Sequence, residues 1–188
     1  MTPRPRVVPM DAGSARKKAR ECGLPAEFAD LSVFRVALHQ PGVAVALHGM
    51  LDALLFRGVL DARLRELIIM RVGWSTHSVY EWTQHWRVAR LLNIPEQDLL
   101  AVRDWERSDR FDADARAVLS ATDDVVRDGV ISPASWAACV AVFEGDDATM
   151  VELVAAIANW SLFSTLLKSL DVPLEDGVSP WPPDGVTP

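Results

Sequence analysis

The feature that most constrains the fold is the lack of strict apolar–polar alternation, the pattern of a half-buried strand, in a chain that is 49% hydrophobic. Apolar residues instead recur at helical spacing between residues that cap or break helices. Asp61, Asp112 and Ser132 stand where helices should begin, and Gly58 and Gly129 where they should end. The sequence predicts an all-α helical bundle. Helices are expected over residues 31–39, 42–58, 61–74, 78–92, 95–105, 112–129, from 132 onward, and 147–170.

At 188 residues the chain suits one domain with flanking tails. Residues 1–29 read as an N-terminal arm that leads into a short basic helix, and residues 30–171 as the helical domain. Residues 172–188 are rich in proline and glycine, so this tail is expected to be loose or laid on a neighbouring element.

A faint internal repeat is visible when Glu66 is aligned with Glu152, which pairs "ELIIMRVGW" with "ELVAAIANW". Such an echo suggests two pseudo-repeated helical halves. The alternative is chance, because any two buried helices share leucine and valine.

Charge and cysteine content restrict the partners and the compartment. A net charge of −7 argues against a nucleic-acid surface and against attraction to anionic lipid. Cys22 and Cys139 form no CxxC pair, and the N-terminal residues hold no apolar segment of signal-peptide length, so we expect a cytoplasmic protein.

One apolar segment, residues 150–167, is nearly long enough to cross a membrane. It carries Glu152 near its start and Asn159 in its middle, and such groups are costly within a bilayer. A buried core or subunit-interface helix is the preferred interpretation.

The densest group of proton-handling residues lies on the helix expected from residue 78. Ser78, Glu81 and His85 share one face, and Tyr80, the single tyrosine of the chain, lies on an adjacent stripe. If the preceding helix returns as an antiparallel hairpin, Glu66 lies about 12 Å from the turn, at 1.5 Å per residue. That depth favours a Glu66–His85 pair over a Glu66–Ser78 pair. A carboxylate so placed fixes the imidazole tautomer for proton transfer.

Structural interpretations of the same residues stay open. Ser78 and Glu81 fit a capping box, and Glu66 could simply neutralise a nearby arginine. Tryptophans at this spacing favour a core. Three potential metal ligands, His77, Glu81 and His85, extend over about 12 Å of one helix, too far for one ion, so we expect no metal.

The pattern resembles the carboxymuconolactone decarboxylase and AhpD-like alkylhydroperoxidase superfamily. Its members have a glutamate followed, twelve residues later, by Cys-x-x-Cys-x-x-x-His. Glu66 takes the glutamate position, Ser78 and Glu81 take the two cysteine positions, and His85 takes that of the histidine. The resemblance is strongest in "LDARLRELIIMRVGW", "YEWTQH" and "ELVAAIANWSLFSTLLKSLDVPL". It implies an all-α AhpD-like fold.

The missing thiols disfavour the thiol peroxidase cycle of the alkylhydroperoxidase branch, because serine and glutamate cannot form a disulfide. The decarboxylase branch implies an acid/base lyase or isomerase that needs no cofactor and acts on a small carboxylated lactone or keto acid. Alternatives are a peroxidase-related protein that uses Cys22 or Cys139 and a non-catalytic oligomeric binding protein. The residues implied as catalytic are Glu66, Tyr80, Glu81 and His85, and those implied as substrate-binding are Ser78, Arg71 and Trp82.

The resemblance also implies a small-molecule substrate and self-association. A trimer or a hexamer built from trimers is favoured, with a dimer as the alternative, and no nucleic-acid or membrane partner is expected.

Overall fold

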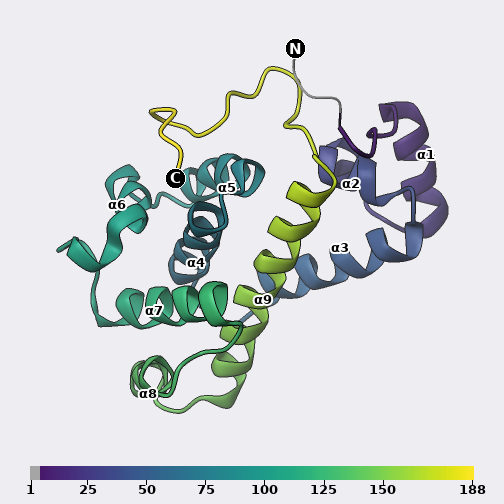
Figure 1. The fold of residues 1–188 in the computed structure, drawn as a ribbon. Coiled ribbons are helices and arrows are strands. Elements are labelled where there is room, and N and C mark those ends of the chain that lie inside the picture. Colours follow the sequence, from purple (N-terminus) through teal and green to yellow (C-terminus); the bar gives the residue numbers. More distant parts are fainter. Residues whose placement is uncertain (1–4) are drawn as a thin grey trace. The chain divides into compact units, whose positions relative to one another are not determined.

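The computed structural model describes residues 5–188, and over these residues the chain is helical with no strand, as predicted (Figure 1). The elements in order are α1 (Ala12–Cys22), η1 (Ala26–Asp30), α2 (Ser32–Ala37), α3 (Pro41–Phe56), α4 (Ala62–Ser75), α5 (Val79–Leu91), α6 (Glu96–Ala101), η2 (Val102–Arg107), α7 (Ala113–Asp128), α8 (Pro133–Val142) and α9 (Asp147–Ser169).

Local capping chemistry sets most helix boundaries. The side chains of Asp61, Asp112 and Ser132 each accept a hydrogen bond from the backbone N–H three residues on, which confirms them as N-caps. Gly129 ends α7 with a left-handed φ of 77°. The predicted C-cap at Gly58 is wrong, since α3 ends at Phe56 and is capped by Arg57.

A long-range contact explains the glycine at position 58. A Cβ placed there would lie 2.0 Å from Oε1 of Glu152, and Oε2 of Glu152 accepts a hydrogen bond from the Val59 N–H. Glycine therefore allows the α9 carboxylate to approach the α3–α4 connection.

Backbone contacts divide the chain into two compact units. One contains the chain up to Arg57 together with Thr165–Ser179, and the other contains Gly58–Ser164 and Pro180–Pro188. The boundaries expected at 29/30 and 171/172 do not coincide with these limits. The N-terminal segment packs with α2 and α3, as shown by the hydrogen bond from the Met10 N–H to the Arg35 carbonyl.

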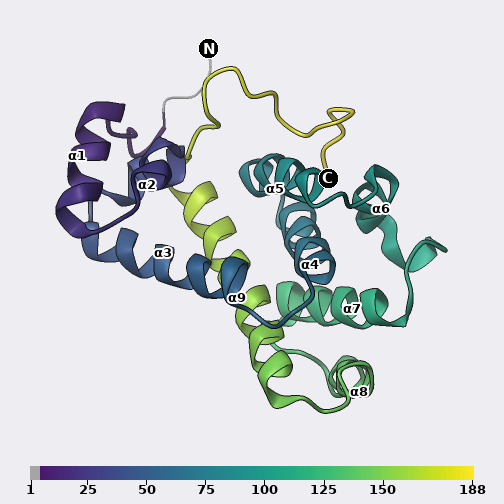
Figure 2. The ribbon, with the colours of Figure 1, turned by 180° about the vertical axis from the view of Figure 1, so that it is seen from behind.

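The second unit is built on a hairpin of α4 and α5, with α7 against α4 and α8 against α7 (Figures 1 and 2). Helix α4 is buried nearly all round, which explains its apolar sequence. Gly73 lets the hairpin close, because a Cβ there would lie 3.1 Å from the Trp82 backbone nitrogen and 3.4 Å from the Glu81 Cβ. Fully buried α4 side chains include Leu67, Ile68, Ile69, Met70 and Val72.

The end of the C-terminal tail is laid on the second unit, one of the two predicted alternatives. The Trp82 indole N–H donates to the Pro182 carbonyl at 2.8 Å, and the Trp181 N–H donates to the Thr83 hydroxyl at 3.2 Å. The Arg103 guanidinium donates hydrogen bonds from two nitrogens to the Asp184 carboxylate, and this contact lowers the pKa of Asp184 to about 2. These bonds fix the tail although it forms no helix.

Among the described residues, α9 is the one helix long and apolar enough to cross a membrane, and half of its most apolar window is buried within the protein. Leu153, Ile157 and Trp160 are buried there, as expected of a core helix. The sequence of α9 is similar to that of α4, but no helix follows α9 in the described chain. The α4–α5 hairpin therefore has no counterpart formed by α9 and a following helix.

Candidate functional site

The predicted contact between α4 and α5 is present. Glu66 lies in the middle of α4 with no exposed surface, and His85 on α5 is 9% exposed. The His85 Nδ1 and Glu66 Oε2 atoms are 2.8 Å apart. The prediction that Glu66 pairs with His85, made from helix rise and hairpin geometry, is confirmed.

The second oxygen of Glu66 faces a cation. Arg65 Nε lies 3.4 Å from Glu66 Oε1, and the Arg65 side chain is itself buried. The proposed neutralisation of an arginine is therefore present as well. One carboxylate is shared by a guanidinium and an imidazole, an arrangement that holds the imidazole ring in place.

Glu81 completes the cluster from one turn earlier on α5. Its Oε2 lies 3.7 Å from His85 Nε2, and the residue is 4% exposed. The alternative capping box is not formed, because the Ser78 N–H already donates to the Gly73 carbonyl. Ser78 occupies the N-cap position without a side-chain cap bond, and within the described residues its buried hydroxyl has no hydrogen-bond partner.

Trp160 of α9 was not anticipated as a site residue. Its indole Nε1–H donates to His85 Nε2 at 3.0 Å, with the two rings edge to face at 85° and 5.6 Å between centroids. Trp160 is 1% exposed. Seventy-five positions separate it from His85, and no local spacing in the sequence reveals such a contact.

Burial and charge shift the proton affinities of the cluster. Desolvation raises the pKa of Glu81 to about 7, with Glu66 adding to the rise and His85 opposing it. Burial opposes protonation of His85, but the Glu66 carboxylate outweighs it and raises the pKa of the imidazole. The hydrogen bond from Trp160 opposes that rise, since only unprotonated Nε2 accepts it. The Glu81 carboxyl group and the His85 imidazole thus compete for protons, because the pKa of each is raised.

The raised pKa of Glu81 gives a stability prediction. Between the ordinary value of 4.5 and about 7 the folded state holds the proton more tightly than the unfolded state, so stability falls as pH rises. At about 1.4 kcal/mol per pH unit the loss is about 3 kcal/mol. We expect the stability advantage of Glu81→Gln over the unmodified protein to grow by that amount from about pH 4 to about pH 8, measured by urea unfolding.

A matched control for this measurement is Glu106→Gln, which changes an exposed carboxylate. Its stability relative to the unmodified protein should stay constant across the same range. An equally flat difference for Glu81→Gln would mean that burial does not hold a proton on Glu81.

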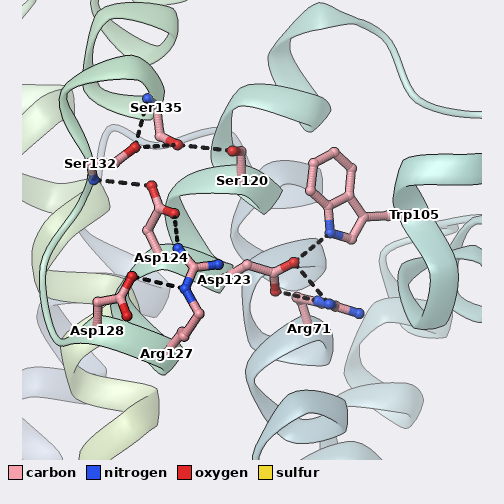
Figure 3. Close-up of polar contacts among 9 residues, drawn as sticks. All are labelled: Arg71, Trp105, Ser120, Asp123, Asp124, Arg127, Asp128, Ser132 and Ser135. Carbon is pink, nitrogen blue, oxygen red and sulfur yellow. Dashed lines mark hydrogen bonds and ion pairs between the residues drawn. The ribbon is translucent and has the colours of Figure 1, made fainter.

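Arg71 has other partners than the predicted substrate. Its Nε and Nη2 bind both oxygens of Asp123 (Figure 3). Its Nη1 donates to the carbonyls of Val102 and Arg103. Asp123 also accepts from the Trp105 indole at 2.8 Å. All three guanidinium nitrogens are thus engaged between α4, α7 and η2, which corrects the expectation that Arg71 is a free cation for a substrate carboxylate.

Trp82 and Tyr80, also predicted site residues, are both buried. Trp82 has no exposed surface, donates its indole N–H to the tail, and stacks among tryptophans with the Arg103 guanidinium 4.9 Å from its ring. It belongs to the core that anchors the tail, and its predicted contact with a substrate stays a prediction.

Neither cysteine is placed for thiol chemistry at the family positions. Cys139 on α8 is buried, and burial raises the pKa of its thiol to about 11. Cys22 lies on α1, in the other unit, with its thiol directed at the Ala19 carbonyl. Positions 78 and 81 hold serine and glutamate.

Comparisons with known proteins agree with this architecture. Residues 41–124 match the carboxymuconolactone decarboxylase family. The chain resembles the crystal structure of an uncharacterized peroxidase-related protein from Ralstonia eutropha JMP134, described as an alkylhydroperoxidase AhpD core. The TM-score is 0.74 and the identity 18%, covering 94% of this chain and 95% of that one.

Two further structures share the fold. A peroxidase-related protein from Silicibacter sp. TM1040 gives a TM-score of 0.70 at 14% identity, over 97% of this chain and 95% of its own. The debrominase Bmp8, solved in complex with 2,3,4-tribromopyrrole, gives a TM-score of 0.71 at 15% identity, over 90% of this chain and 91% of its own. No curated protein matches the sequence significantly. Residues 41–124 are therefore similar to the carboxymuconolactone decarboxylase family, and the chain has the AhpD-like all-helical fold that its sequence resembles.

Proposed function

We propose that the protein is a cofactor-free acid/base enzyme, a lyase or isomerase that acts on a small carboxylated lactone or keto acid. The observation that carries this proposal is the buried triad of Glu66, His85 and Glu81, in which one imidazole lies between two carboxyl groups at 2.8 and 3.7 Å. The match of residues 41–124 to the carboxymuconolactone decarboxylase family supports the substrate class.

The chemistry follows from the roles that the contacts allow. Glu66 fixes His85 through Nδ1, and Nε2 can take a proton from a substrate once its lone pair is released from the Trp160 indole N–H. Glu81, with a pKa of about 7, can hold a proton and return it to carbon. In a decarboxylation, the bond to CO₂ breaks, its electron pair delocalises toward the lactone or keto carbonyl, and Glu81 protonates the resulting carbanion equivalent. Solvent then restores the proton on Glu81.

A thiol peroxidase is the competing function suggested by the names of two structural neighbours. Its cycle requires a thiolate nucleophile and a resolving thiol. Here the corresponding positions hold Ser78 and Glu81, and the raised pKa of Cys139 disfavours its thiolate. The acid/base assignment accounts for the titratable groups that are present.

Self-association and a cytoplasmic location stay predictions from the sequence. Val151, Val154 and Leu162 on α9 are exposed apolar residues, and such residues support contact with another copy of the chain.

A substrate screen tests the proposed function. Small lactones and keto acids that carry a carboxylate would be incubated with the protein and followed by CO₂ release and by proton exchange at carbon. We expect turnover that declines above about pH 7 as Glu81 loses its proton. A parallel assay would follow hydroperoxide consumption before and after alkylation of both thiols. Hydroperoxide consumption lost on alkylation, with no CO₂ release or exchange, would replace the acid/base function with a thiol-based one.

A further inference from the structure

The contact between Trp160 and His85 carries information about where the protons reside. An indole nitrogen can only donate a hydrogen bond. Because Trp160 Nε1 lies 3.0 Å from His85 Nε2, the imidazole nitrogen must supply the lone pair. The other ring nitrogen, Nδ1, then carries the hydrogen and donates it to Glu66 at 2.8 Å. Both contacts require the same tautomer of His85.

Two groups compete for Nε2. Trp160 needs it unprotonated, whereas Glu81 Oε2, 3.7 Å away, is favoured by an Nε2 that carries a proton. The other charged groups acting on His85 are Glu66 and Arg65, both from α4. All of these residues are at least nine-tenths buried, so water does not easily replace the contact that is lost.

The competition between Trp160 and Glu81 for Nε2 decides whether His85 or Glu81 carries the proton that can be donated. If Nε2 is protonated, His85 is a cation beside an ionised Glu81 and the hydrogen bond from Trp160 is lost. If Nε2 is unprotonated, the same proton resides on Glu81 and the bond from Trp160 is kept. The two states contain the same number of protons, and the indole N–H favours the second.

We propose that Trp160 is a positioning residue that keeps Nε2 of His85 unprotonated and so directs the labile proton of the cluster to Glu81. In the proposed reaction this makes Glu81 the acid and His85 the base. The catalytic meaning of this assignment rests on the proposed function, but the proton positions do not.

Nuclear magnetic resonance of the full chain, uniformly labelled with ¹⁵N, tests the assignment without a substrate. The His85 resonances would be identified by their loss in His85→Gln, since the chain has four histidines. At a pH where the ring is neutral, we expect the Nδ1–H tautomer and a scalar coupling across the hydrogen bond from Trp160 Nε1 to His85 Nε2.

The decisive variant is Trp160→Phe, which keeps an aromatic ring and removes the donor. Losing a hydrogen bond made only by the neutral ring should raise the pKa of His85 by about one pH unit. The matched control is Trp105→Phe, which removes an indole donor to Asp123 instead (Figure 3). It should leave the titration of His85 unchanged.

An unchanged or lowered pKa of His85 in a folded Trp160→Phe protein would overturn the proposal. Should that variant fail to fold, the unmodified protein decides, because absence of the N–H···N coupling contradicts the contact itself. Once a substrate is known, the rising limb of the pH–rate profile, which requires unprotonated His85, should shift toward higher pH by the same amount in Trp160→Phe. A positive spectroscopic result with no turnover would sustain the proton assignment and remove only the proposed function.

Discussion

Replacing His85 with glutamine is expected to lower kcat/KM for the decarboxylated or isomerised substrate by about 10²- to 10⁴-fold, the usual contribution of a general base. Glutamine cannot accept a substrate proton at neutral pH. It can still face the Glu66 carboxylate with an amide donor, so the buried acceptor keeps a partner. The substitution should therefore lower turnover while the protein keeps its folded structure.

The matched control for this measurement is His48→Gln. His48 on α3 packs edge to face on Phe28, with 4.5 Å between ring centroids, and it is not part of the Glu66 cluster. Its replacement should leave kcat/KM within about twofold of the unmodified value, while His85→Gln shows the full loss. Turnover above a tenth of normal in a folded His85→Gln protein would remove His85 from the mechanism.

Features that depend on neighbours in sequence were predictable. Asp61, Asp112 and Ser132 cap helices because the cap needs only an N–H three residues away. The Glu66–His85 pair was within reach for a related reason: two adjacent helices joined by a short turn have one plausible register. Resemblance to a known family marked the same residues.

Features that depend on distant residues were not predictable. The partner of Arg71 is Asp123, 52 positions away, so Arg71 looked like an unoccupied cation in the sequence. Gly58 looked like a helix cap, whereas its lack of a Cβ serves the approach of Glu152 from α9. Trp160 reaches His85 through the same kind of long-range packing.

The capping-box interpretation shows how a correct local pattern can lose to tertiary contacts. Ser78 and Glu81 have the right spacing, and Ser78 does occupy the N-cap. The Gly73 carbonyl takes the Ser78 N–H, and Glu81 lies beside His85 instead. Because the Ser78 N–H at the start of α5 already donates to the hairpin turn, the Glu81 carboxyl group is free to join the buried cluster.

Replacing Glu66 with leucine should lower the free energy of unfolding by about 3–5 kcal/mol, the usual cost of removing one partner of a buried ion pair. Glu66 has no exposed surface and contacts both Arg65 and His85. The substitution leaves the Arg65 cation, 8% exposed, without that carboxylate. Urea unfolding of Glu66→Leu alone and in combination with Arg65→Met separates the cost of the unpaired charge from the cost of altered packing. Removing the unpaired Arg65 cation should restore part of the lost stability.

The loss should also depend on pH with a definite sign. Glu66 raises the pKa of His85 above its ordinary value of 6.5, so the folded state binds that proton more tightly than the unfolded state. The stabilisation from this pair is complete below 6.5 and is lost as pH rises through the pKa of the folded protein. The cost of Glu66→Leu should therefore be larger at about pH 6 than at about pH 9, where the Arg65 contribution remains. A cost below about 1 kcal/mol at both pH values would show that the buried carboxylate does not hold its two partners.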